Sequence, residues 1–382
     1  MRKKIFYKLL LDCISFFLIS VLSASLIIWV VQAVNFLDII IDDGRNISTY
    51  LKYTLSNLPK IIAKITPFII LLTLIYIFSK YEKKNELIIF WNFGVNKIQV
   101  VNFFFYISII VTILQIFIVS IIVPYTQDYS RKIIKNSSID FINSFIKTKK
   151  FNASLEGITL FNNSRDENGN LYEVYVKNGE KNNFQIIFAK KGRVNVQNNQ
   201  NFLELFDGRT LSYINGNVSE FNFSKTQIVL NQFESGIITH RKTQQVSTIN
   251  LFKCYFQLYK QTANVDLSQI LNIENCKSEN INNIIREFYK RLVVPLYIPV
   301  IILVSLLLLL TSKEKKFYNR KVLFTFFLGL TFLILSEANQ RFISKNLYSN
   351  LFIFSLPIIF TIIMNIIFYV KLNFKEKIND SL

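Results

Sequence analysis

Apolar residues are gathered into six long blocks, and each block carries few or no charged side chains. A helix that crosses the hydrocarbon core of a bilayer needs roughly 20 largely apolar residues. Irregular backbone exposed at that depth would leave amide groups unpaired, so each block is predicted to be a spanning helix. The blocks cover residues 13–34, 61–79, 99–123, 292–311, 322–336 (extendable to 340) and 351–370.

The first block follows a basic start at Arg2, Lys3 and Lys4, which a cleavable signal peptide would share. Its apolar run is longer than the usual core of a signal peptide, and no small-x-small cleavage site closes it. We therefore predict a retained first helix and six spans.

Residues 151–229 follow another pattern, in which short runs of aromatic and β-branched residues alternate with clusters of Asn, Gly and Asp. Such runs predict strands of a β-sandwich or jelly-roll domain. The predicted fold class is a membrane α-helical bundle of six transmembrane helices, three and three, with an inserted all-β jelly-roll domain. The predicted parts are 1–128 (first three spans), 129–283 (β domain and a partly helical connector) and 284–382 (last three spans).

The net charge of +19 is distributed unevenly between the two sides of the predicted membrane. Sixteen Lys and Arg lie in the N-terminus, the C-terminus and the loops after the second and fourth spans, against six in the opposite short connections. The positive-inside rule therefore predicts that both termini are cytoplasmic. The β domain is then extracytoplasmic, and the basic surplus does not indicate a nucleic-acid partner.

Three cysteines and one histidine leave little material for metal or thiol chemistry. Cys13 lies in a span and is expected to pack as a small apolar residue. Cys254 and Cys276 share an oxidising compartment, but nothing in the sequence brings them within bonding distance, so a bridge is not predicted and their state stays open. His240 has no second histidine beside it and is expected to be a solvated loop residue.

The sequence has no glycine-rich phosphate loop, so we expect no enzyme and no cofactor, with any ATP hydrolysed by another chain. After the second span, near residues 82–96, Leu87, Phe90, Trp91 and Gly94 recur at helical spacing behind a charged start that includes Glu86. A short helix lying on the membrane surface has this pattern, and so has one docked in a groove of a cytoplasmic partner.

Two motifs carry a resemblance to a known family. Glu86 precedes an apolar run that ends at Gly94, and Glu287 is followed four residues later by Arg291 and then by Pro295. The first resembles the coupling helix, and the second the entry to the fourth helix, of the LptF/LptG permeases. With six spans divided by a β domain, the resemblance covers almost the whole chain.

The resemblance implies a permease subunit of an ABC transporter that extracts lipopolysaccharide from the bacterial inner membrane and passes it to a periplasmic bridge. It implies four partners, namely lipopolysaccharide, a cytoplasmic ATPase dimer, a second homologous permease and a bridge protein of jelly-roll fold. Residues 151–229 lack tryptophan, which favours the F type over the G type.

Members of this family tend to carry basic side chains near the outer end of helix 1, where this chain has Gln32, Asn35 and Asp38. Lys60 and Lys64, at the start of the second span, could supply that charge for lipid phosphates, or could snorkel to the interface.

Arg341 follows Glu337 by four residues at the outer end of the fifth span. It is predicted either to pair with Glu337 within the helix or to bind a lipid phosphate. Two other classes of protein remain open. A mechanotransmission subunit would be expected to have fewer spans, and a membrane-anchored periplasmic assembly protein would need no coupling helix.

Overall fold

The structure is a computed structural model of the chain. Asp38 and His240, both named above, lie outside the residues that it describes. The described residues are 2–37, 47–136, 148–155, 158–166, 169–180, 183–197, 200–214, 217–229, 242–260, 276, 278–314, 317–344 and 347–379.

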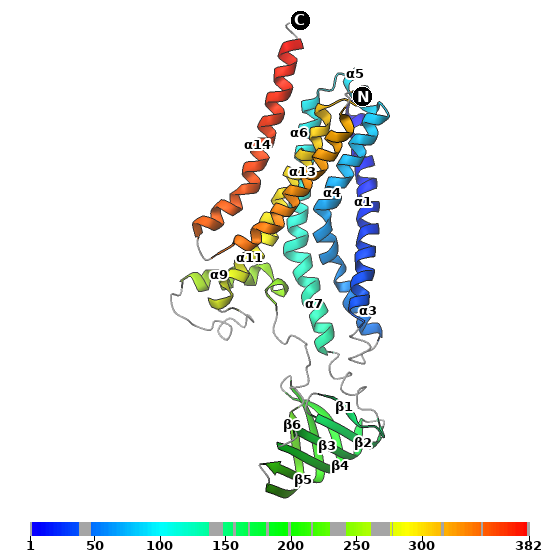
Figure 1. The fold of residues 1–382 in the computed structure, drawn as a ribbon, viewed down its shortest axis with the longest axis vertical. Coiled ribbons are helices and arrows are strands. Elements are labelled where there is room, and N and C mark those ends of the chain that lie inside the picture. The colour runs from blue at the N-terminus through cyan, green and yellow to red at the C-terminus, as the bar shows by residue number, and fades with distance from the viewer. Residues whose placement is uncertain are drawn as a thin grey trace. The chain divides into compact units, whose positions relative to one another are not determined.

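Within these residues, six helical segments are long and apolar enough to cross a membrane, as predicted (Figure 1). Most of them extend beyond their apolar blocks, because the helices continue into polar residues. The first three spans consist of α1 (Arg2–Asn35); α3 (Ile47–Ser56) with α4 (Leu58–Lys83); and α6 (Lys97–Phe117) with η1 (Ile118–Ile122) and α7 (Val123–Asn136). The last three consist of α11 (Ile281–Phe288), η5 (Tyr289–Val293), η6 (Val294–Leu296), α12 (Tyr297–Leu306) and η7 (Leu307–Leu310); α13 (Tyr318–Ala338) with η8 (Asn339–Phe342); and α14 (Leu347–Asn379).

Helix α12 forms the centre of the bundle. All 10 of its residues are buried, and it packs against α4, α6, α13 and α14. The outer helices keep large apolar side chains exposed, such as Ile19 and Ile27 of α1, as expected where lipid replaces water as the solvent. Gly329 lets α13 approach α4, because a Cβ there would lie 2.3 Å from Leu71 Cδ1.

The fourth span changes its helix type around Pro295. A proline inside a helix lacks an N–H, and its ring collides with the carbonyl group four residues earlier. The chain accommodates Pro295 with the π-turn η5 and the 3₁₀ turn η6 before it resumes as α12. The irregular segment lies in the wall of the cavity described below.

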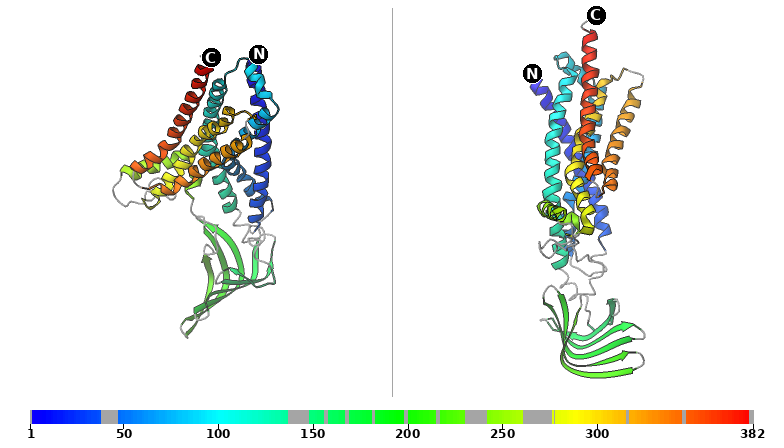
Figure 2. Two further views of the ribbon diagram at one scale, coloured as in Figure 1. Left: turned by 45° about the horizontal axis from the view of Figure 1, so that its top comes forward. Right: turned by 90° about the vertical axis from the view of Figure 1, so that its left-hand side faces the viewer.

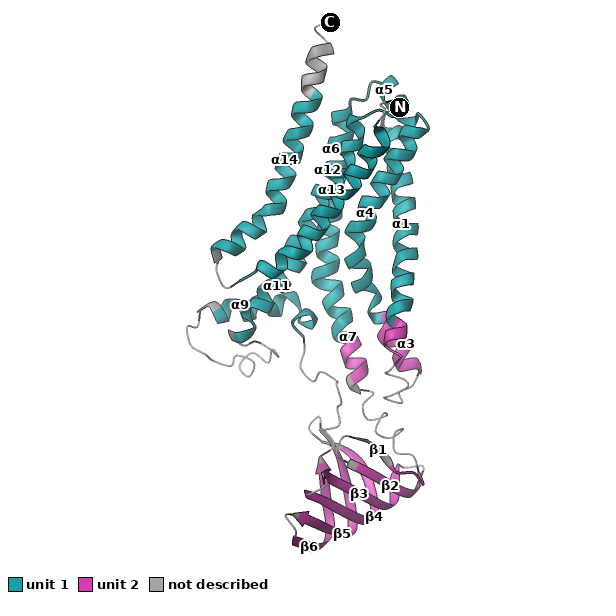
Figure 3. Ribbon diagram, in the orientation of Figure 1, with its two compact units in different colours: residues 1–32, 56–129, 240–382 teal, residues 33–55, 130–239 magenta. Residues whose placement is uncertain are grey.

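The chain divides into two compact units (Figure 3). The first comprises residues 1–32, 56–129 and 240–382 and holds most of the spanning helices. The second comprises residues 33–55 and 130–239 and holds the β domain.

The β domain contains a curved antiparallel sheet of 6 described strands, whose neighbours follow the order of the sequence (Figure 2). An inserted β domain is therefore confirmed, and its described strands form one meander. Leu160 pairs with Val176, which pairs with Ile187, and these side chains belong to the buried face of the sheet. The strands are β1 (Asn152–Leu155), β2 (Ile158–Arg165), β3 (Asn170–Glu180), β4 (Asn183–Gln197), β5 (Gln200–Ile214) and β6 (Asn217–Val229).

Short helices occupy the two connections of interest. They are α5 (Glu86–Asn92) between the second and third spans, and η3 (Thr243–Gln245), α9 (Thr248–Lys260) and η4 (Ser278–Asn280) before the fourth span. Cys254 of α9 is bonded to Cys276, with their Cα atoms 5.8 Å apart. The sequence left the state of these two cysteines open, and in the structure they form a bridge. Helix α9 packs on α11, so both cysteines enter one buried apolar cluster with Leu251, Ile284 and Phe288.

Candidate functional site

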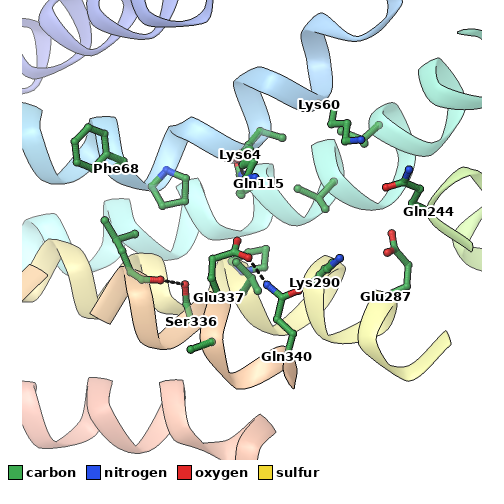
Figure 4. Close-up of a pocket in the computed structure, with 18 of the residues that line it drawn as sticks. Lys60, Lys64, Phe68, Gln115, Gln244, Glu287, Lys290, Ser336, Glu337 and Gln340 are labelled. Atoms are coloured by element: carbon green, nitrogen blue, oxygen red, sulfur yellow. Dashed lines mark hydrogen bonds between the residues drawn. The ribbon is translucent and has the colours of Figure 1, made fainter. Parts of the chain in front are cut away.

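A cavity of about 1040 Å³ lies among the spanning helices (Figure 4). Its walls come from α4, from α6, η1 and α7 of the third span, from the fourth span, and from α13 and η8 of the fifth. Residues far apart in the sequence, from Lys60 to Arg341, therefore line one space.

The two ends of the cavity differ in chemistry. Phe68 lies at one end, whereas Lys60, Gln244, Glu287 and Lys290 gather at the other (Figure 4). The apolar part of the lining consists of Pro67, Phe68, Val119, Val123, Val294, Leu330, Leu333 and Ile334. An apolar wall joined to a charged end suits an amphiphilic ligand.

The three predicted lipid-binding residues all line this cavity. Lys60 and Lys64 are one helical turn apart on α4, and Arg341 comes from η8. Lys290 is a fourth lining cation that the sequence analysis missed. It is three residues after Glu287, a spacing that places both on the same side of a helix, so the helix-4 motif could have indicated it.

A second hollow of about 460 Å³ shares lining residues with the charged end of the cavity. It shares Gln244, Glu287 and Arg341 and adds the cations Lys242 and Arg286. Together the two hollows are lined by six cations and two carboxylates: Lys60, Lys64, Lys242, Arg286, Lys290 and Arg341 against Glu287 and Glu337. The combined lining of the two hollows therefore carries more positive than negative charge and favours an anionic group.

Arg291, the basic residue of the helix-4 motif, is fully buried and holds three segments together. Its Nε donates to Glu287 Oε1 at 3.0 Å, its Nη1 to Thr248 Oγ1 at 2.8 Å, and its Nη2 to the carbonyl oxygen of Gln244 at 3.1 Å. Thr248 in turn donates to the carbonyl oxygen of Ser120 in η1. Arg291 fixes the wall that carries Glu287 and Gln244.

Glu337 and Arg341 do not form the ion pair that was one of the two predictions. The carboxylate of Glu337 instead accepts a hydrogen bond from Gln340 Nε2 (Figure 4). Among the described residues Arg341 forms no ion pair, and its side chain is exposed at the cavity.

Buried Gln115 adds a polar group to the apolar wall. Its Nε2 donates to the carbonyl oxygen of Ala63 at 2.7 Å. Its Oε1 has no hydrogen-bond partner among the described residues. The bond to Ala63 therefore fixes Gln115 beside Lys64, in the middle of the cavity lining (Figure 4).

The predicted short helix near residues 82–96 is α5, and its residues divide between two faces. Leu87 and Phe90 are buried in the bundle, where the Phe90 ring meets that of Phe6 at 6.0 Å. Trp91 is partly buried and lies under Lys97 Nζ at 5.4 Å. These three coupling candidates hold the helix on the protein, and its exposed apolar residues are Ile88 and Ile89, followed by Phe93.

Gly94 ends this helix. Its φ of 69° lies in the left-handed region that glycine adopts without strain. Its N–H donates to the carbonyl oxygen of Trp91 at 2.9 Å, and the N–H of Val95 donates to that of Phe90 at 3.0 Å. This pair of bonds is the Schellman motif. Glu86 lies in the first turn and is partly exposed.

A family model described as "Lipopolysaccharide export system permease LptF/LptG" matches residues 9–371. The chain belongs to the LptF/LptG permease family. The permease is also similar to the uncharacterized protein RP871 of Rickettsia prowazekii (strain Madrid E), at 26% identity over 338 residues. That similarity covers 86% of the permease and 88% of RP871. Family membership and six spanning segments make the chain a multi-pass membrane permease of the lipopolysaccharide export system.

Proposed function

We propose that this permease extracts lipopolysaccharide from the bacterial inner membrane and passes it to a periplasmic bridge. The observation that carries the proposal is the amphiphilic cavity of about 1040 Å³. Lipid acyl chains fit an apolar wall, and the phosphates of lipid A fit the lining cations Lys60, Lys64, Lys290 and Arg341. Charge-assisted contacts in a partly dry site are stronger than the same contacts in water.

Lipid movement would be driven from the end of the bundle that carries α5. A cytoplasmic ATPase dimer binds the exposed face of α5, with Glu86 meeting a basic residue of the ATPase. Closure of the dimer on ATP pushes α5, and buried Leu87 and Phe90 transmit the movement to the spanning helices. The cavity narrows and expels its lipid, so this chain contributes differential binding and force rather than bond chemistry.

Three further partners complete the proposal. A second homologous permease faces this one and closes the lipid space. Both termini are cytoplasmic and the β domain is periplasmic, where an exposed strand edge joins the jelly-roll of the bridge protein. The F type remains our prediction for this chain, because residues 151–229 lack tryptophan.

The proposal is favoured over two other classes of function. A mechanotransmission subunit moves a periplasmic domain without carrying lipid, and neither the six spans nor the amphiphilic cavity is needed for that. A membrane-anchored assembly protein has no need of a surface for an ATPase.

Release of lipopolysaccharide from proteoliposomes tests the proposal. The permease is co-purified with its ATPase and second permease, reconstituted with lipopolysaccharide, and supplied with ATP and the soluble bridge protein. We expect ATP-dependent transfer that Lys64→Ala reduces and Lys321→Ala, at the opposite end of the bundle, does not. A complex that hydrolyses ATP yet releases no lipid would favour mechanotransmission, and failure to co-purify an ATPase would favour the assembly protein.

A further inference from the structure

Helix α9 is amphipathic, and one of its two sides is already occupied by the protein. Leu251 and Cys254 are buried, and Tyr255 and Leu258 pack against the same cluster. The other side carries Ile249 and Phe256, which are 70% and 62% exposed. Phe252 lies at the edge of this side, where it is 44% exposed and its ring centroid is 4.4 Å from that of Phe288.

The exposed side of α9 carries one further residue, Lys253. Positions 249, 252, 253 and 256 are spaced i, i+3, i+4 and i+7, which places them on a single face. Residues 248–260 contain no Asp or Glu. An apolar stripe with lysine and without acidic residues is typical of a helix that lies in the interface of an anionic membrane.

The position of α9 in the bundle agrees with this chemistry. The helix runs across the direction of the spanning helices, beside the start of the fourth span (Figures 1 and 2). The Cys254–Cys276 bridge fixes its middle, and the bond from Arg291 to Thr248 Oγ1 fixes its first turn. A helix held sideways at the end of a membrane span, with exposed apolar side chains on one side, is positioned to meet the lipid headgroups.

We propose that α9 is an interfacial helix whose exposed face, made of Ile249, Phe252, Lys253 and Phe256, is inserted into the surface of the lipid leaflet. The aromatic rings lie at the boundary between headgroups and acyl chains, and the Lys253 ammonium group reaches the phosphates. The inference needs only that the chain spans a membrane, so it stands whether or not lipopolysaccharide is transported.

An inserted α9 would place the charged end of the cavity level with the membrane surface. The segment that precedes α9 contains Gln244, which lines the cavity and accepts a bond from Arg291. Thr248, in the first turn of α9, binds the same guanidinium group. The depth of α9 therefore determines the depth at which the lining cations meet lipid phosphates.

Quenching of tryptophan fluorescence by brominated phospholipids measures this depth. The intact complex carries Phe256→Trp in a chain whose native Trp29 and Trp91 are replaced by Phe, and it is reconstituted in nanodiscs of anionic lipid. We expect a blue-shifted emission that is largely lost when bromine lies close to the headgroup and less reduced when bromine lies deep in the acyl chain. Phe221→Trp, an equally exposed position in the β domain, should keep its emission.

Two results would overturn the proposal. Red-shifted, unquenched emission from residue 256 would place this face of α9 in water, and blue-shifted, unquenched emission would show that a protein covers it. Should the chain that lacks Trp29 and Trp91 fail to assemble, a benzophenone amino acid at Phe252 in the otherwise native chain tests the same contact. Adducts with phospholipid support the proposal, whereas adducts with a protein, or none, contradict it.

Discussion

At the scale of single residues, Arg291 of the helix-4 motif has a structural role, whereas its partner Glu287 also lines the cavity. Its guanidinium group is fully buried and bonded to a carboxylate, a hydroxyl group and a carbonyl oxygen. Three such acceptors offset the loss of hydration that burial of a charge requires. Glu287, its partner at 3.0 Å, lines the cavity. The arginine thus positions the wall, and the cations that meet the cavity come from its neighbours.

Replacement of Arg291 by Ala is predicted to destabilise the bundle. Removal of one member of a buried ion pair leaves the other charge uncompensated and costs about 3 to 5 kcal/mol. Arg291→Lys should have a smaller effect, because lysine keeps the charge but cannot donate to three acceptors with fixed geometry. The melting temperature of the purified complex measures both changes.

The matched control for Arg291 is Arg320→Ala, which removes an exposed arginine from α13. Its melting temperature should stay close to that of the unaltered chain. An Arg291→Ala complex as stable as this control would contradict the structural role.

Glu204 gives the β domain a dependence on pH. The hydrogen-bonded ion pair with Lys225 at 3.1 Å lowers the pKa of Glu204, and the hydrogen bond from Gln227 at 2.8 Å adds to this effect, against the opposing effect of burial. Because the pKa of Glu204 is lower in the folded state, the ionised carboxylate contributes its whole stabilisation at pH values above the ordinary carboxyl pKa. That stabilisation is lost as the pH falls through the lowered value.

Glu204→Gln is therefore predicted to destabilise the β domain at neutral pH and to reduce its further loss of stability in acid. Limited proteolysis of the full-length protein over a series of pH values measures this, with Glu220→Gln, at an exposed glutamate, as the control. If the acid sensitivity of Glu204→Gln equals that of the control, the assignment to Glu204 is wrong.

The sequence predicted the positions of several site residues but not their orientation. Lys60 and Lys64 were singled out as a replacement for the basic residues that the family carries near helix 1, and Arg341 by its spacing from Glu337. All three line the cavity. The partner of Glu337 was open, because Gln340 and Arg341 both lie within reach of it along one helix. Lys290 was overlooked, since periodicity alone does not show which side of the fourth span faces a cavity.

At the scale of elements, α5 combines a face that anchors it with a face that remains exposed. The sequence predicted a short helix near residues 82–96, and α5 covers Glu86–Asn92 within that range, with an acidic residue at its start and Gly94 just beyond its end. It did not separate the faces, because Leu87, Phe90 and Trp91 share an apolar character with Ile88, Ile89 and Phe93. Burial now assigns the first three to the bundle.

The exposed face of α5 yields a prediction about the ATPase. Ile89→Asp places a charge in the proposed apolar contact and should weaken ATPase association by about 2 kcal/mol or more. Glu86→Ala should cost about 2 to 5 kcal/mol if Glu86 pairs with a basic residue of the ATPase, but only about 0.3 to 1 kcal/mol if it merely interacts with the helix dipole. Co-purification of the ATPase at increasing salt measures both.

The control for α5 is Asn92→Ala, at an exposed residue of the same helix, which should retain the ATPase. Normal ATPase stoichiometry in both Ile89→Asp and Glu86→Ala would show that α5 is only a surface helix of the membrane.

In the β domain and the connector, some features could not be predicted from local sequence patterns. Alternating apolar residues predicted strands, but the pattern is local, and the order of strands in a sheet depends on pairing between distant segments. The state of Cys254 and Cys276 was left open by the sequence for the same reason. Only the packing of α9 on α11 brings the two cysteines together.

At the scale of the whole molecule, the charge distribution predicts the orientation in the membrane. Exposed Ser164 of β2 should be periplasmic, and exposed Glu314, after the fourth span, should be cytoplasmic. A membrane-impermeant maleimide applied to intact spheroplasts should label Ser164→Cys, and should label Glu314→Cys only after permeabilisation. The reverse pattern would overturn the topology and, with it, the proposed direction of transport.

In the proposed function, lipopolysaccharide occupies the cavity and ATP hydrolysis expels it. Ile334 lines the cavity, whereas its neighbour Leu335 lies outside the lining at about the same depth on α13. A photo-crosslinking amino acid at each position, in the complete complex with lipopolysaccharide, measures occupancy directly. We expect adducts at residue 334 that decline when ATP and the bridge protein are added, and few adducts at residue 335. Equal labelling of the two positions, unchanged by ATP, would contradict it.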